Sequence, residues 1–63
     1  MRNVIKIKRW DADLKQYELA FQLGCNASYL SMVENQRVDA TDDFKEKAAK
    51  FFGVEIKDLF LEN

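Results

Sequence analysis

The fold of this chain is decided by residues 16–34, whose sequence is QYELAFQLGCNASYLSMVE. Apolar residues recur in this stretch at helical spacing, in two groups: Leu19, Ala20 and Leu23, followed by Leu30 and Val33. Gly24 lies just past the first group, where a left-handed backbone costs little only for glycine. The stretch therefore predicts two short helices, over about residues 16–23 and 27–34, that are joined by a glycine turn.

Asn26 stands directly before the second of these helices, where its side chain can accept hydrogen bonds from the first free backbone amides. Two helices joined by a turn of about three to four residues that contains Gly form the helix-turn-helix unit. Such a pattern also arises from packing alone, so the flanking sequence has to show whether this unit binds DNA.

A further helix is expected before the unit, from about Val4 to Trp10, with Asn3 as its N-cap. Residues 4–8 also alternate between apolar and basic side chains, as in a half-buried strand. We favour the helix, because the two helices of the unit need a third helix to cover them.

Two more helices are expected after the unit. Thr41 can cap the first of them, which has two aspartates in its first turn, where the helix dipole favours negative charge. The core face of this helix would carry Phe44, Ala48, Phe51 and Phe52. Gly53 ends it, and a last helix would run from about Glu55 to Phe60, with Leu59 turned inward. The predicted fold class is therefore all-α, a compact bundle of five short helices around a central helix-turn-helix.

The size and composition predict one small domain over residues 1–63, because a chain this short has no room for a second core. The hydrophobic fraction of 48% suffices for one core and argues against disorder. No apolar run approaches the roughly 20 residues of a membrane span, and the N-terminal sequence lacks the features of a signal peptide. A single cysteine forms no intrachain disulfide, which fits a reducing compartment. We therefore expect a cytoplasmic protein without membrane contact.

The residue types argue against an enzyme. The chain has no His, its one Cys cannot build a zinc cluster, and no Gly-rich phosphate loop is present. We expect no catalytic residue, cofactor, metal or small-molecule ligand.

The net charge of −1 argues mildly against nucleic acid, but the charge is unevenly divided. Residues 1–37 carry six Lys and Arg against four Asp and Glu, whereas residues 38–63 carry four against seven. The half that holds the helix-turn-helix is thus the basic one, and the acidic half would lie away from DNA. In so small a domain, a difference of this size can also arise by chance.

A set of motif residues extends beyond the unit over nearly the whole chain. In the unit and directly after it, the set comprises Gln16, Glu18, Leu19, Ala20, Leu23, Gly24, Leu30, Val33, Glu34, Asn35 and Arg37. Arg9, residues 49–54 and residues 58–60 extend the match to both ends. With these residues the chain resembles the XRE family, the helix-turn-helix domains of phage lambda-type repressors and Cro-like regulators. The resemblance implies a lambda repressor-like fold and binding to operator DNA, in a bacterium or a phage-infected cell.

The resemblance also implies how the unit would meet DNA. The first helix of the unit crosses the DNA backbone, and the second enters the major groove with its N-terminal residues on base edges. By position, the expected DNA contacts are Gln16, Asn26, Ala27, Ser28, Tyr29, Met32, Asn35 and Arg37. Gln16, Asn35 and Arg37 would bond phosphates, while Tyr29 could stack, bond a phosphate or pack on the surface.

The chain departs from the family at several positions. Lys15 replaces the usual Ser or Thr cap, Gln36 stands where Gly is common, and Ala40 stands near a common Pro. The helix expected in the groove presents no Lys or Arg to DNA. Ala27 and Met32 can touch thymine methyl groups but cannot donate to guanine, so the expected base readout is weak or favours A·T pairs.

Three side-chain groups near the unit have a structural interpretation. The resemblance implies that Arg9 and Glu34 form the ion pair that ties the first helix of the chain to the end of the groove-binding helix. Cys25 is expected to be a buried, inert thiol rather than a redox switch, because buried cysteine behaves as a small hydrophobe. Trp10 is expected at the edge of the core.

The predicted function is that of a sequence-specific transcriptional regulator, a repressor or a Cro-like protein. It would bind a pseudo-palindromic operator in double-stranded DNA as a homodimer. Phe60 and Leu61, near the end of the chain, are the candidate dimer contact. The alternative is a protein-interaction module that binds another regulator through the acidic C-terminal half.

Overall fold

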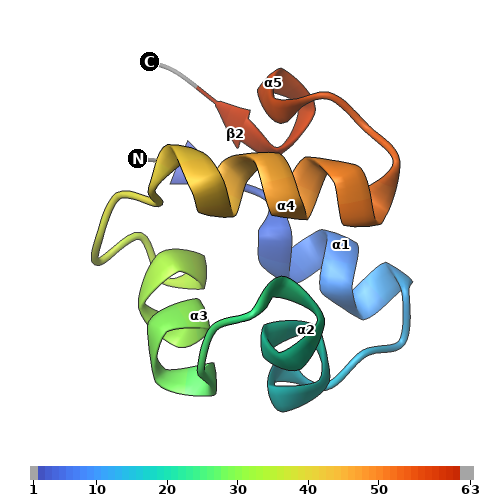
Figure 1. The fold of residues 1–63 in the computed structure, drawn as a ribbon, viewed down its shortest axis with the longest axis vertical. Coiled ribbons are helices and arrows are strands. Elements are labelled where there is room, and N and C mark those ends of the chain that lie inside the picture. Colours follow the sequence, from blue (N-terminus) through green and yellow to red (C-terminus); the bar gives the residue numbers. More distant parts are fainter. Residues whose placement is uncertain (1, 62–63) are drawn as a thin grey trace.

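Five helices and one short ribbon of two strands make up the computed structural model, which describes residues 2–61. In chain order the elements are β1 (Arg2–Asn3), α1 (Ile5–Asp11), α2 (Gln16–Leu23), α3 (Ala27–Glu34), α4 (Asp42–Phe52), α5 (Ile56–Leu59) and β2 (Phe60–Leu61). Figure 1 shows α4 across the middle of the molecule, with α2 and α3 on one side and α5 with the ribbon on the other. The all-α prediction is confirmed apart from this ribbon. Among the described residues, no helix has the length and apolar character needed to cross a membrane.

The helix-turn-helix unit has the predicted bounds at both helices. Gly24 ends α2 in the left-handed conformation, with a φ of 72°. Asn26 caps α3, because its side-chain oxygen accepts a hydrogen bond from the Tyr29 backbone amide at 2.7 Å. At the start of α2, the Lys15 side chain contains no acceptor, and the Glu18 carboxylate instead accepts from the Lys15 backbone amide at 2.8 Å. Glu18 therefore supplies one half of a capping box and partly offsets the missing Ser or Thr cap.

The N-terminal segment contains a short strand followed by a helix, whereas its sequence had left strand and helix as alternatives. Residues 2–3 form β1, which pairs antiparallel with β2 so that Asn3 lies opposite Phe60. α1 then starts at Ile5, one residue later than predicted. The predicted N-cap was wrong, because Val4 occupies that position. Asn3 nevertheless contributes, since its side-chain oxygen accepts a hydrogen bond from the Ile5 amide at 3.1 Å.

α4 starts as predicted, because the Thr41 hydroxyl accepts a hydrogen bond from the Phe44 amide at 3.2 Å. The residues that α4 buries are Phe44, Ala48 and Ala49. The prediction that Phe51 fills the core was wrong, because its side chain is 40% exposed and meets the edge of the neighbouring Phe52 ring. Phe52, the next residue, is the ring at this end of α4 that packs against the core.

Two other expectations were also wrong. The last helix, α5, is shorter than predicted, because the chain extends at Phe60 and pairs with β1. Trp10 is 62% exposed rather than at the core edge. Arg9 takes the inward position on α1, and the next residue points about 100° further round the helix. The Trp10 ring lies 5.9 Å from the Lys6 Nζ atom instead.

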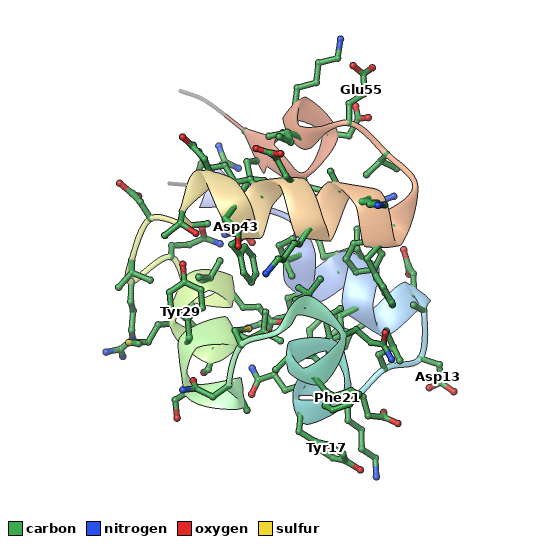
Figure 2. All side chains as sticks on the ribbon, viewed as in Figure 1. Asp13, Tyr17, Phe21, Tyr29, Asp43 and Glu55 are labelled. Carbon is green, nitrogen blue, oxygen red and sulfur yellow. The ribbon has the colours of Figure 1, made fainter. Side chains whose placement is uncertain are left out.

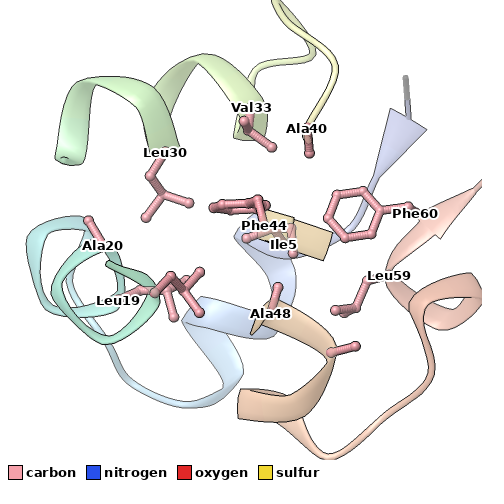
Figure 3. Packing of buried hydrophobic residues seen from close by; sticks show 12 residues of the cluster. Ile5, Leu19, Ala20, Leu30, Val33, Ala40, Phe44, Ala48, Leu59 and Phe60 are labelled. Carbon is pink, nitrogen blue, oxygen red and sulfur yellow. The ribbon is translucent and has the colours of Figure 1, made fainter. Parts of the chain in front are cut away.

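The core draws on every helix (Figure 3). Its fully buried larger side chains are Ile5 from α1, Leu19 from α2, Leu30 and Val33 from α3, and Leu59 from α5. Phe44 of α4 lies among them and meets the Phe60 ring edge-on, with 6.3 Å between the ring centroids. Each such side chain contributes about 1.5–3 kcal/mol by leaving water. Leu30 and Val33 therefore hold α3 to the body by one face, as predicted, and its other face remains outside.

Candidate nucleic-acid interface

α3 presents one exposed face along its length. Ser28 and Met32 on the helix, and Asn35 directly after it, follow one another at i, i+4 and i+7 spacing, and all three are exposed. Leu30 and Val33 face the opposite way and are fully buried. A helix held in this manner can enter the major groove of B-DNA, which is about 12 Å wide.

The N-terminal end of α3 has few but usable polar groups. The Asn26 oxygen is occupied by the Tyr29 amide, which leaves the Asn26 amide nitrogen available to donate. Ser28 is exposed, and its hydroxyl can donate or accept. Ala27 is half-buried, and Met32 is 39% exposed. This end of the helix therefore suits apolar contacts and single hydrogen bonds to base edges, rather than the bidentate contact of Arg or Lys with guanine.

Tyr29 lies between α3 and α4 (Figure 2). Its ring is half-buried and meets the Phe44 ring edge-on, with 5.5 Å between the ring centroids. Its hydroxyl accepts a hydrogen bond from the Thr41 backbone amide at 3.3 Å. The ring therefore packs, but the hydroxyl hydrogen can still be donated to a phosphate.

The C-terminal end of α3 is held by a buried ion pair, as predicted. Arg9 donates from its Nε atom to the Glu34 carboxylate at 2.7 Å and from a terminal nitrogen at 3.2 Å. The other terminal nitrogen of Arg9 donates to the Leu14 carbonyl at 2.9 Å. Arg9 and Glu34 are only 9% and 3% exposed. This two-point pairing connects α1, the loop before α2 and the end of α3.

Gln16 joins this group from the start of α2. Its side-chain nitrogen donates to the Glu34 carboxylate at 3.0 Å, so the predicted phosphate contact is oriented by the ion pair. A primary amide has two N–H groups, and the second one remains for a phosphate oxygen. The first turn of α2 and the last turn of α3 therefore lie side by side, as a backbone contact that flanks the groove requires.

Asn35 and Arg37 are exposed beyond the end of α3. Asn35 donates to the Ser31 carbonyl at 2.9 Å and accepts from the Lys6 Nζ atom at 3.1 Å. Lys6 was not among the DNA contacts predicted from the sequence, and it adds a positive charge from α1 beside the predicted phosphate contacts. Its charge was part of the basic character of residues 1–37, but its distance along the chain from Asn35 gave no reason to pair the two residues.

Cys25 is half-buried between α2 and α3 and packs against the core. Burial raises the pKa of its thiol, and the nearby Lys47 ammonium opposes this shift. The thiol is therefore protonated at neutral pH. The expectation of a buried residue was wrong in part, because Cys25 is only half-buried, and its inert role stays a prediction.

Of the two candidate dimer-contact residues, Phe60 is buried and Leu61 is exposed. Phe60 is only 4% exposed, with Phe44 against its ring and the Lys45 Nζ atom 5.7 Å from the ring centroid. The proposal of Phe60 as a contact with a second copy is thus corrected, because β2 turns its ring into the core. Leu61, the next residue of the strand, points the other way and is 38% exposed.

α2 carries two exposed aromatic side chains that we did not single out from the sequence. Phe21 is 82% exposed, and Tyr17, one helical turn earlier, is 63% exposed. Figure 2 shows both rings at the outer side of α2, away from the other helices. The signal was the apolar stripe itself, since the positions it leaves unused on α2 must face outward.

The similarity to known proteins covers the whole fold and not only the helix-turn-helix unit. Residues 5–59 match the family model described as helix-turn-helix. The chain is 36% identical over 61 residues to a protein of Methanocaldococcus jannaschii that is named as an uncharacterized HTH-type transcriptional regulator. The aligned region covers 97% of this chain and 92% of that relative. Both matches run from α1 to α5, so the likeness includes the helices that hold the unit in place.

Proposed function

Since this chain belongs to the helix-turn-helix family of DNA-binding transcriptional regulators, we propose that α3 is its recognition helix and lies in the major groove of operator DNA. The observation that carries the proposal is the exposed face of Ser28, Met32 and Asn35, on a helix whose opposite face is fully buried. Gln16 and Arg37 would contact the DNA backbone beside this face.

The proposed contacts divide into two groups by chemistry. Base edges are contacted by Asn26, Ala27, Ser28 and Met32. Phosphates are contacted by Gln16, Asn35 and Arg37, together with the Tyr29 hydroxyl. Phosphate contacts set the register and the orientation of the helix, whereas base contacts carry the sequence information. Because α3 contains no Lys or Arg, the favoured sites are rich in A·T pairs.

We further propose that two copies bind a pseudo-palindromic operator. Two-fold symmetry would then place the two recognition helices about 34–36 Å apart, one turn of DNA. Leu61 is the exposed apolar residue of the predicted dimer contact. Light scattering of the free protein and of its complex with DNA measures the number of copies, and Leu61→Asp should lower that number if this strand forms the contact.

A salt titration tests DNA binding itself. A preferred duplex is first selected from a random library, and its affinity is then measured over a range of salt concentrations. The logarithm of the affinity should fall linearly with the logarithm of salt, by about 0.9 for each phosphate contact. A flat salt response, or equal affinity for random duplex, would refute the proposal.

Two alanine substitutions, each of which removes one positive charge, distinguish the proposed interface from the rest of the surface. Arg37→Ala should weaken binding to all duplexes and reduce the salt slope by about one. Lys57→Ala on α5 removes the same charge at the far side of α4 and should change neither quantity (Figure 1).

A further inference from the structure

We propose that Asn3 and Gln36 are positioning residues for DNA binding. Their hydrogen-bonded side chains hold the turn of residues 35–37, which carries the expected phosphate contacts Asn35 and Arg37, against the N-terminal strand. The inference rests on the proposed function, because it concerns how the same surface is held in place. Neither residue belongs to the set through which the chain resembles its family.

The turn after α3 requires a left-handed residue at position 36. The Arg37 amide donates to the Met32 carbonyl at 2.8 Å, and the Gln36 amide donates to the Val33 carbonyl at 3.1 Å. These two bonds form the closing arrangement that usually has glycine at its left-handed position. Gln36 takes that position with a φ of 61°, which is unfavourable for a residue with a Cβ atom. A compensating interaction is therefore expected.

The Gln36 side chain supplies this compensation. Its nitrogen donates to the Glu34 carbonyl at 3.0 Å and, more weakly, to the Asn3 carbonyl at 3.4 Å. Its oxygen accepts from the Asn3 side-chain nitrogen at 3.1 Å. A glycine at this position would form the turn without the side-chain bonds between residue 36 and Asn3.

Asn3 completes the connection from the other side. Its side-chain nitrogen also donates to the Val33 carbonyl at 2.8 Å, so it bonds the last turn of α3 directly. β1 is fixed in turn by its pairing with β2, opposite the buried Phe60, and the next residue, Val4, donates its amide to the Leu59 carbonyl at 2.9 Å. The end of the proposed recognition helix is thereby bonded to the strand pair, in addition to its bonds with Arg9 and Gln16.

The consequence concerns the two residues that flank Gln36. Asn35 precedes it and Arg37 follows it, so a rotation of this turn would move both predicted phosphate contacts together. The Asn3–Gln36 pair limits that rotation before DNA arrives, and less ordering is then required on binding. Neither side chain needs to touch DNA to exert this effect.

Gln36→Gly is the primary test, because it keeps the left-handed turn and removes only the side-chain links. Asn3→Ser is the second variant, since the shorter side chain can still cap the Ile5 amide but cannot reach Val33 or Gln36. Affinity for the selected duplex is measured over the salt series, together with the thermal midpoint of the free protein. Each variant should raise Kd on the order of tenfold and reduce the salt slope by up to about one. Gln36→Gly should leave the thermal midpoint close to that of the wild type, because relief of the left-handed strain offsets the lost bonds.

The double variant decides whether the two residues act as a pair. If they do, combining Gln36→Gly with Asn3→Ser should cost less affinity than the sum of the two single losses, because both changes remove the same Asn3–Gln36 bond. Additive losses would show that each residue acts separately and would overturn the inference. Unchanged Kd and salt slope in both single variants would also overturn it, while a steep salt slope of the wild type would leave the proposed function standing. A wild type without salt-dependent, preferential binding would instead refute the proposed function itself.

Discussion

The two ends of α3 differ in how they are held. At the N-terminal end, the Asn26 side chain accepts one hydrogen bond from the Tyr29 amide, and Ser28 on the outer face is small and exposed. At the C-terminal end, the buried Glu34 carboxylate accepts hydrogen bonds from Arg9 and Gln16, and Gln36 in the turn beyond it accepts one from Asn3. The difference indicates that the placement of α3 and its base specificity depend on different residues. The end that is firmly bonded sets the placement of the helix, and the free end can change its base preference with little effect on the fold.

The largest expected effect is the loss of stability when Arg9, which holds the C-terminal end of α3, is replaced. Arg9→Ala leaves the buried Glu34 charge without its partner, which costs about 3–5 kcal/mol. A domain of this size has modest stability, so the variant should be largely unfolded at room temperature, as measured by far-UV circular dichroism. Lys57→Ala is the control, because its pair with Glu55 spans 3.8 Å between exposed side chains and should contribute almost nothing. An unchanged melting temperature of Arg9→Ala would contradict the role given to this ion pair.

Changes at the free end should alter specificity rather than folding. Ser28→Ala and Met32→Ala should each reduce the discrimination between the selected duplex and random duplex by about 1–3 kcal/mol. Their melting temperatures should stay near that of the wild type, because both side chains are exposed. Arg37→Ala is the matched comparison from the other end, since it should weaken both duplexes equally. A uniform loss for Ser28→Ala and Met32→Ala would show that these residues position the helix instead.

The cap at the free end should have a smaller effect on stability. Asn26→Ala removes the acceptor of the Tyr29 amide and should lower the free energy of unfolding by about 1 kcal/mol, measured by urea denaturation. Asn26→Ser keeps an acceptor at the same position and should recover most of the loss. If both variants were equally unstable, the cap would not be the reason for the loss.

The smallest expected effect concerns Cys25, which lies in the turn before α3 and contributes to the pH dependence of stability. Burial raises its pKa in the folded protein above the usual 9.0, so this thiol stabilises the fold below that pH and loses its contribution as pH rises through the raised value. Thermal midpoints of the wild type should therefore fall slightly more than those of Cys25→Ala between neutral pH and strongly alkaline pH. Identical pH profiles would show that ionisation of Cys25 is not coupled to folding.

Local sequence was sufficient where local chemistry decides the structure. The bounds of α2 and α3 follow from Gly24, Asn26 and the apolar spacing, all of which act within a few residues of the chain. The start of α4 at Thr41 follows from the same kind of rule. The Arg9–Glu34 pair was predicted through the family resemblance rather than from spacing, since its members lie 25 residues apart.

Long-range packing decided the positions that were predicted wrongly. Phe51 and Phe60 are both aromatic, but the structure exposes the first and buries the second. The burial of Phe60 depends on the pairing of β1 with β2, which leaves no periodic signal in the sequence. Trp10 likewise points outward because Arg9 takes the inward position on α1.

The sequence by itself determined five helices, the bounds of the helix-turn-helix and the shortage of charge on α3, because spacing, caps and residue type act locally. The tertiary structure alone decided that Gln16 is bonded to Glu34, that Lys6 reaches Asn35 and that Asn3 holds Gln36 in a left-handed turn. These contacts join residues 18 to 33 positions apart. Their formation depends on the relative placement of whole helices and strands, which is set by the shared core and not by any single segment.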